Sequence, residues 1–374
     1  MTTMTESLKI GLAGYGYAGQ TFHAPLIAGS GATLAAISTS QAELARHDWP
    51  QAQIVADFDA LLAVPGLDAV VIATPNDTHF DLARRAIEAG KHVVVDKPLT
   101  VTLAEAFALE KLAAQYQRLV APFHNRRWDG DFLTLKKLLG NGTKDATESG
   151  TESAESSGRL GRITHFESHF DRFRPLVRAR WREEAVRGGG ILLDLGPHLL
   201  DQALSLFGLP QTLSATVEAH RDGALADDYC HLVLGYPRHQ VILHASTLTA
   251  LVPPRFLVHG TRGSYLKHSL DVQEDQLKAG LRPDDVDFGV NPTGVLRVLE
   301  GNAEVQFEAQ YELPTEVGTY TEFYRLFAQA VLHGGPLPVT IGEAINVMHL
   351  IGLAQESART GQRLTVGEID RPAS

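Results

Sequence analysis

A glycine-rich turn near the N-terminus constrains the fold of this chain more than any other feature. Gly14, Gly16 and Gly19 have the spacing G-x-G-x-x-G, and the turn directly follows the apolar run Leu8–Ala13. A helical pattern, Ala18–Ala28, starts inside it. Between a buried strand and a helix, this spacing is the fingerprint of a dinucleotide-binding βαβ unit. An ordinary strand–helix turn is the alternative interpretation.

Each of the three glycines has its own physical reason. Gly14 permits the tight turn, Gly16 lets the backbone approach a pyrophosphate, and Gly19 lets the helix pack close to the strand. The N-terminus of the helix offers free N–H groups and the positive end of its dipole to phosphates. We therefore predict that the whole turn, Gly14, Tyr15, Gly16, Tyr17, Ala18 and Gly19, binds a cofactor.

Residues 1–125 alternate short apolar runs with amphipathic helical patterns. The apolar runs lack polar alternation, as expected for strands that are buried on both faces. Strand–helix alternation predicts an α/β Rossmann domain with a doubly wound parallel sheet. The expected strands are Leu8–Ala13, Thr33–Ser38, Gln53–Val55, Ala69–Thr74, His92–Val95 and Arg118–Pro122.

Residues 126–374 have a different order of predicted elements, because several segments with strand character follow one another without a helix between them. Grouped strands predict an α+β second domain with an open, mainly antiparallel sheet. The stretch 142–157 is rich in Gly, Ser, Thr and Glu, and we interpret it as a flexible surface insertion. Residues 291–310 match no element clearly. Two helices, expected at 316–332 and 341–357, close the chain, and packing of these helices against the first domain is left open.

Composition excludes several classes of function. The 374 residues have a formal net charge of −11, which argues against a general nucleic-acid or anionic-membrane surface. No apolar run approaches the roughly 20 residues that span a bilayer. Cys230 is the one cysteine, so an intrachain disulfide framework is impossible and a cytoplasmic location is expected.

The end of the second predicted strand bears on the choice of cofactor. NAD enzymes carry an Asp or Glu there for the ribose 2′-hydroxyl, whereas this chain has Ser38 and Thr39. A carboxylate would repel a 2′-phosphate, and hydroxyl groups can donate hydrogen bonds to one. NADP(H) is therefore the preferred cofactor, with Arg46 a distant cation. The hydroxyls could also simply end a strand, which leaves NAD(H) possible.

Two motifs follow the fourth and fifth predicted strands. They contain Thr74-Pro75-Asn76 with His79, and Asp96-Lys97-Pro98. Both stand at carboxyl ends of parallel strands, the edge at which open α/β sheets bind ligands. A lysine there is often a solvated surface residue, but the proline directly after it restricts the turn and favours a fixed role for Lys97.

A third motif lies in the second domain, where Gly188-Gly189-Gly190 precedes a helical pattern. Asp194 and His198 are four residues apart, so they share a helix face and are expected to hydrogen-bond. A carboxylate that holds an imidazole suits a general acid/base near neutral pH. A capping role for Asp194 at a helix start near Pro197 is the alternative.

In this order, the motifs resemble those of the glucose–fructose oxidoreductase/inositol dehydrogenase/rhizopine-catabolism (Gfo/Idh/MocA) family, from about Leu8 to the C-terminal helices. The segments 124–128, 181–182 and 190–202 look like a branch that contains an NADP-dependent scyllo-inositol dehydrogenase. The family commonly has Glu where Asp96 stands here. The resemblance implies hydride transfer between NADP(H) and a sugar, inositol or related polyol, in a homodimer or dimer of dimers that pairs through the second sheet.

The resemblance also implies a role for each matching residue. Lys97 would contact the oxygen of the reacting carbon, and His198, supported by Asp194, would exchange the proton. The residues implied to lie near the cofactor are Thr74, Pro75, Asn76, His79, Asp96, Asn125, Trp181 and Arg182. Those implied to contact substrate are Lys97, Arg126, Arg172, Asp194 and His198.

Two other classes of function compete with this hypothesis. A dinucleotide-binding regulator without catalysis would have no need of Lys97 and His198. A metal-dependent hydrolase is suggested only by His165 and His169, which would share a face of a strand, and no metal site is expected. The substrate stays open: arginines 172, 174 and 178 could bind hydroxyls or a carboxylate, or could form a solvated charge cluster.

Overall fold

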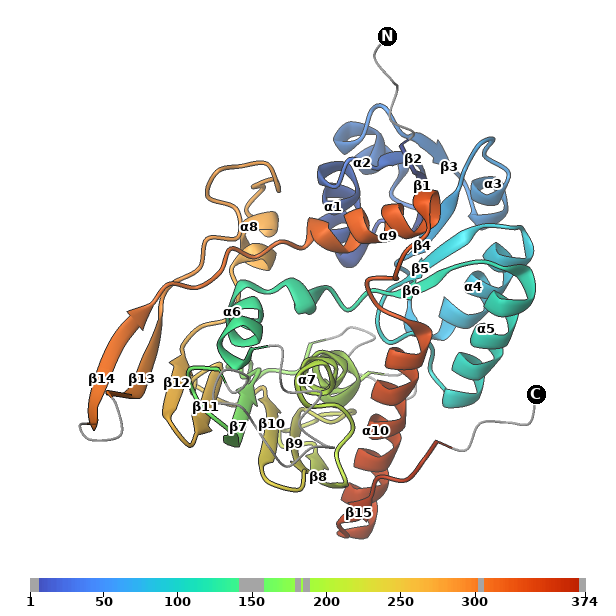
Figure 1. Cartoon of the computed structure of the whole chain (residues 1–374). Coiled ribbons are helices and arrows are strands. Elements are labelled where there is room, and N and C mark those ends of the chain that lie inside the picture. The colour runs from blue at the N-terminus through green and yellow to red at the C-terminus, as the bar shows by residue number, and fades with distance from the viewer. Residues whose placement is uncertain (1–6, 141–157, 179–182, 184–188, 302–305, 370–374) are drawn as a thin grey trace.

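The computed structural model describes residues 7–140, 158–178, 183, 189–301 and 306–369 (Figure 1). The insertion predicted at 142–157 lies outside these ranges, as do Trp181 and Arg182. Within the described ranges, none of the helices combines the length and the apolar character needed to cross a bilayer.

The first sheet is a six-stranded, all-parallel sheet with the order β3-β2-β1-β4-β5-β6. Its central strands are buried on both faces, which explains why they read as continuous apolar runs. The predicted doubly wound Rossmann fold is confirmed. The order reverses between β1 and β4, so the ligand crevice is expected at their carboxyl ends. The strands are β1 Lys9–Ala13, β2 Thr33–Ser38, β3 Gln53–Val55, β4 Ala69–Ile72, β5 His92–Val95 and β6 Val120–Pro122.

Helices cover both faces of this sheet (Figure 1). The first begins with a wide π-type turn, Gly19–His23, and continues as α1, Ala24–Gly29. The others are α2 Ala42–Asp48, α3 Phe58–Leu62, α4 His79–Glu88 and α5 Leu103–Tyr116.

The second sheet has nine strands in the order β14-β13-β12-β11-β7-β10-β9-β8-β15. All neighbours are antiparallel except β7 and β10, which confirms the open, mainly antiparallel sheet. Residues 291–310, which the sequence leaves unassigned, supply β13 and the start of β14. The bounds are β7 Ile163–His169, β8 Thr212–Glu218, β9 Tyr229–Gly235, β10 Gln240–Ser246, β11 Phe256–Gly260, β12 Gly263–Lys267, β13 Gly294–Gly301, β14 Gln306–Leu313 and β15 Leu364–Thr365.

The helices of the C-terminal part connect the two sheets. Phe323 and Phe327 of α9 pack in one core cluster with Leu8 and Ile10 of the first domain. The long helix α10 runs beside α7 and β8, and its first turns reach α5 (Figure 1). These contacts hold α7 close to the edge of the first sheet. The bounds are α6 Gly130–Leu139, α7 Ile191–Phe207, α8 Gln273–Lys278, α9 Thr321–His333 and α10 Ile341–Thr360.

Candidate active site

The glycine turn between β1 and the first helix has the geometry of a phosphate cradle. Gly14 has a φ of +95°, and a Cβ there would lie 2.4 Å from the carbonyl oxygen of Ala73. A Cβ at Gly19 would lie 2.2 Å from the Gly14 oxygen, so each position excludes a side chain for a different reason. A Cβ at Gly16 would meet nothing within 4 Å, which leaves open space for a ligand to approach the backbone. These residues fit a bound dinucleotide.

The two tyrosines of the turn point in different directions. Tyr15 is buried; its hydroxyl donates to Asp48 at 2.8 Å and accepts from the Trp49 indole at 2.9 Å. Its side chain therefore fixes the turn to α2, and only its main chain is available to a cofactor. Tyr17 lies beside Ala18 at the cavity, and its hydroxyl donates to Glu274 at 2.7 Å. Burial and the Glu274 carboxylate raise the pKa of Tyr17 to about 12.

Ser38 and Thr39 stand at the end of β2 beside the glycine turn. The Ser38 carbonyl accepts a hydrogen bond from the Gly14 N–H at 2.9 Å. The Thr39 hydroxyl accepts from the Gln41 N–H at 2.9 Å, just before α2. Both residues are half-buried, and Arg46 is exposed on α2. Ser38 and Thr39 therefore lie at the end of β2, where the sequence predicts recognition of the cofactor ribose.

The turn after β4 is fixed by its own side chains and by His79. The hydroxyls of Thr74 and Thr78 are 2.6 Å apart, and Asn76 is buried. The His79 side chain is fully buried, with its two ring nitrogens 2.8 Å and 3.0 Å from the carbonyl oxygens of Pro98 and Thr74. The His79 side chain therefore joins the turns after β4 and β5, and its predicted place beside the cofactor stays a prediction.

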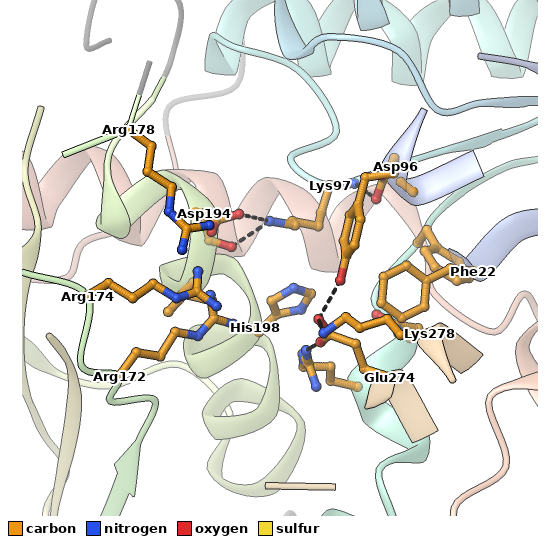
Figure 2. A pocket seen from close by; sticks show the side chains of 16 residues that line it. Phe22, Asp96, Lys97, Arg172, Arg174, Arg178, Asp194, His198, Glu274 and Lys278 are labelled. Atoms are coloured by element: carbon orange, nitrogen blue, oxygen red, sulfur yellow. Dashed lines mark hydrogen bonds and ion pairs between the residues drawn. The ribbon is translucent and has the colours of Figure 1, made fainter. Parts of the chain in front are cut away.

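Lys97 reaches from the turn after β5 to the second domain. Its Nζ donates to the Asp194 carboxylate at 2.9 Å and to the Asp194 carbonyl at 2.5 Å (Figure 2). Asp96 accepts from the Lys97 N–H at 2.8 Å and lies 3.7 Å from the ring of His23. Burial opposes ionisation of Asp96, but His23 and Lys97 outweigh it and lower the pKa of this carboxyl to about 2.

His198 lies in the interior of α7, one turn beyond Asp194. The helix starts at Ile191, so Asp194 is in its first turn and Pro197 lies inside it, not at its start. The His198 Nδ1 is buried and without a hydrogen-bond partner among the described residues, and Asp194 binds Lys97 instead. The predicted hydrogen bond between Asp194 and His198 is therefore wrong. Burial, followed by the charges of Lys97 and Arg126, holds the pKa of His198 well below its usual value.

One cavity of about 390 Å³ brings these residues together between the two sheets (Figure 2). Four residues that the sequence predicts for the site line this cavity: Lys97, Asn125, Asp194 and His198. Its other lining residues are Tyr17, Ala18, Phe22, Asp96, Phe123, Arg126, Arg172, Arg174, Arg178, Leu195, Glu274 and Lys278.

Arg126 lies at this cavity but is already engaged within the protein. Its guanidinium donates to Glu274 at 2.6 Å, lies 3.6 Å from Asp129 and stacks over Phe170. It therefore organises the cavity wall. Glu274 and Lys278 are site residues that sequence reasoning missed, because they lie on the six-residue helix α8, whose polar sequence has no apolar periodicity.

The histidines proposed as metal ligands lie on the uncovered face of the second sheet. His165 and His169 flank Glu167 on β7 and contact its carboxylate at 2.6 Å and 2.9 Å. Among the residues that the structure describes, no group of three or more His, Cys, Asp or Glu side chains is arranged to hold a metal ion.

A Rossmann sheet with a glycine turn at its switch point, and a second sheet that completes the cavity, define a two-domain NAD(P)-binding oxidoreductase. Residues 8–124 match the family model for the oxidoreductase NAD-binding Rossmann fold, and residues 156–366 match the model for the oxidoreductase C-terminal alpha/beta domain. The chain therefore belongs to the Gfo/Idh/MocA oxidoreductase family.

Individual relatives cover nearly the whole chain. The uncharacterized oxidoreductase YdgJ of Escherichia coli is 48% identical over 95% of this chain and 98% of its own length. The scyllo-inositol 2-dehydrogenase (NADP(+)) IolW of Bacillus subtilis is 36% identical, over 95% and 94%. A solved structure from Yersinia pestis has a TM-score of 0.88 at 47% identity and covers 98% of this chain and 99% of that chain.

Proposed function

We propose that this protein transfers a hydride between NADP(H) and a CH–OH carbon of a sugar, inositol or related polyol. The observation that carries the proposal is the meeting of Lys97 and His198 in one cavity, since one comes from the first domain and the other from the second. Both lie beside the glycine turn, at the carboxyl edge of the parallel sheet, where ligands of this fold bind.

Lys97 and His198 have separate roles in the proposed reaction. The bound nicotinamide supplies or accepts the hydride. The Lys97 ammonium, oriented by Asp194, donates a hydrogen bond to the oxygen of the reacting carbon and stabilises its negative charge. His198 is neutral near pH 7 because its pKa is lowered, so Nε2 can accept the hydroxyl proton during oxidation.

Two observations support NADP(H) and a polyol. The end of β2 carries hydroxyls in place of the carboxylate that would repel a 2′-phosphate. The Bacillus subtilis relative, by its name, uses NADP(+) and acts on scyllo-inositol. Comparing kcat/KM for NADPH and NADH with one carbonyl substrate tests the preference, and equal values would contradict it.

We further propose that the protein is a homodimer, or a dimer of dimers, paired through the face of the second sheet that α7 and α10 leave uncovered. Half-buried apolar side chains on this face, such as Val233, Ile242 and Leu257, support pairing. Analytical ultracentrifugation tests it, and a monomer at micromolar concentration would contradict it.

Alanine variants test the catalytic assignment. Lys97→Ala and His198→Ala should each lower kcat by about a hundredfold or more, as expected for loss of a group that binds or moves the proton. Binding of NADPH, followed by its fluorescence, should change little. Lys111→Ala and His333→Ala, on exposed helix positions, are matched controls.

Two outcomes would contradict this function. Wild-type kcat in Lys97→Ala or His198→Ala would remove the catalytic assignment. NADPH binding without oxidation by any member of a broad panel of sugars, keto-inositols and aldehydes would favour the regulatory alternative.

A further inference from the structure

Three arginines from one segment of the second domain line the cavity, opposite Phe22 and Lys278 (Figure 2). The segment continues β7 as extended chain: the N–H groups of Arg172 and Arg174 donate to the carbonyls of Ser246 and Thr247 at 2.8 Å and 2.7 Å. In an extended chain, side chains two residues apart lie on the same side. Arg172 and Arg174 therefore face the cavity together, and Phe173 between them is 59% exposed on the other side.

More positively charged than negatively charged side chains line the cavity. Six are cationic side chains, and three are carboxylates: Asp96, Asp194 and Glu274. Two of these carboxylates are already paired with cations that line the same cavity, Asp194 with Lys97 and Glu274 with Arg126 and Lys278. Asp96 lies 3.7 Å from the ring of His23. This excess of positive charge stands out in a chain with a net charge of −11.

The three carboxylates leave arginines 172, 174 and 178 over, and among these we consider the guanidinium groups of Arg172 and Arg178. Among the described residues, no hydrogen bond or ion pair engages either side chain; Arg172 only stacks over Phe170 at 5.9 Å. Arg172 is half-buried and therefore not fully solvated, whereas Arg178 is exposed. Like charges held together in a cavity repel one another unless an anion lies between them.

The position of these arginines separates them from the phosphates of the cofactor. Figure 2 shows Arg172, Arg174 and Arg178 on one side of the Lys97–Asp194 pair, and Phe22 and Lys278 on the other. The glycine turn lies on the same side as Phe22 and Lys278, because its Tyr17 and Ala18 line the cavity and the Tyr17 hydroxyl donates a hydrogen bond to Glu274 of α8. A ligand group between the arginines therefore lies beyond the reacting centre as seen from the cofactor.

We infer that the substrate is a polyhydroxylated anion, whose carboxylate or phosphate binds Arg172 and Arg178 while its reacting carbon lies at Lys97 and His198. This inference rests on the proposed function and narrows its substrate class. Guanidinium groups match the geometry of carboxylate and phosphate oxygens and bind them with two parallel hydrogen bonds. A neutral polyol would leave these cations without a counter-charge.

Calorimetry on the NADP+-loaded enzyme tests the inference with a matched set of probes: D-glucose, D-glucuronate and D-glucose 6-phosphate at constant ionic strength. The carboxylate and phosphate arms distinguish the two sources of charge. At least one anion should bind about ten- to a hundredfold more tightly than glucose, the range for charge-assisted hydrogen bonds. Arg172→Gln should remove most of this advantage, and Arg172→Lys should restore part of it.

Arg238→Gln is the matched control, because Arg238 is exposed in the turn between β9 and β10, at the opposite end of these strands from Ser246. It should bind all three probes as the wild type does. Glucose binding as tightly as both anions, no binding by either anion, or an equal loss for all probes in Arg172→Gln would overturn the inference. NADPH binding and oxidation of NADPH by neutral carbonyls are measured separately, so the inference can fail while the proposed function stands.

Discussion

Arg127 connects three parts of the molecule, and removing its charge partners should have very unequal effects. Its guanidinium donates two hydrogen bonds to Asp201 of α7, at 2.9 Å and 2.7 Å, and one to Glu343 of α10 at 2.9 Å. The exposed fraction is 10% for the Arg127 side chain and 3% for Asp201, but 40% for Glu343. The Asp201 pair is therefore a buried ion pair, whereas the Glu343 pair is close to a surface one.

These exposures set the expected magnitudes. Asp201→Asn leaves a buried guanidinium without its main counter-charge, which costs about 3–5 kcal/mol of folding free energy. We expect the lower end, about 3 kcal/mol, because Glu343 still pairs with Arg127. Glu343→Gln should cost at most about 1 kcal/mol, as surface pairs do, and glutamine can keep the capping box with Thr340.

Urea denaturation followed by circular dichroism at pH 7 measures both variants against the wild type. The difference between Asp201→Asn and the wild type should shrink as the pH falls below about 4. Burial raises the pKa of Asp201 in the folded protein, but the charge of Arg127 outweighs burial and lowers that pKa below its usual value. The ion pair therefore stabilises the fold fully above the pKa of Asp201 in the unfolded chain, about 3.9, and this stabilisation is lost as the pH falls through the pKa of Asp201 in the folded protein. Equal losses in the two variants, or a gap that is independent of pH, would refute the reasoning.

Three further predictions concern titratable groups. The acid limb of kcat/KM for alcohol oxidation should lie below pH 6.5, because burial and the charge of Lys97 lower the pKa of His198; a limb above that pH would exclude His198 as the base. Asp194→Asn should lower kcat/KM but leave the pH of the acid limb unchanged, because Asp194 binds Lys97 and not His198. A shift of the acid limb in this variant would instead support the hydrogen bond between Asp194 and His198 that the sequence predicts. Burial raises the pKa of Asp131 from 3.8 to about 6, so its contribution to the free energy of unfolding should fall as the pH rises from about 4 to 6. Urea titrations at several pH values should show a smaller fall in Asp131→Asn than in the wild type, and an unchanged fall would contradict the assignment.

The first domain could be predicted almost completely, because parallel strands buried on both faces leave apolar runs in the sequence. β2, β3 and β5 have the predicted bounds. The strand β14 could not be predicted in this way. Most of its residues are exposed, so apolar and polar residues do not alternate along it, and the sequence lacks the pattern that indicates a half-buried strand. The short helix α8 was missed for a similar reason, and with it the two charged residues that close one side of the cavity.

The sequence could predict that Lys97, Asn125, Asp194 and His198 share a site, but not how they pair. Spacing alone suggested that Asp194 holds His198, since residues four apart share a helix face. The structure gives Asp194 a stronger partner, Lys97, which is 97 positions away in the chain and reaches it only because the two domains meet. Burial also changes roles that residue type suggests: Tyr15 and His79 lie in ligand-binding motifs, yet their side chains stabilise the turns from inside.

The groups assigned to the reaction and the arginines proposed to bind the substrate lie on different parts of the fold, and this separation matters for how substrates can vary. Lys97 follows β5, beside a turn that His79 fixes through two carbonyls, and His198 lies inside α7, which Arg127 ties to the rest of the protein. The groups assigned to hydride and proton transfer therefore stand on packed elements. Arg172 and Arg178 belong to the segment between β7 and α7, which carries none of the groups assigned to hydride and proton transfer. Relatives could thus keep the same reaction and change the substrate by changing this segment alone.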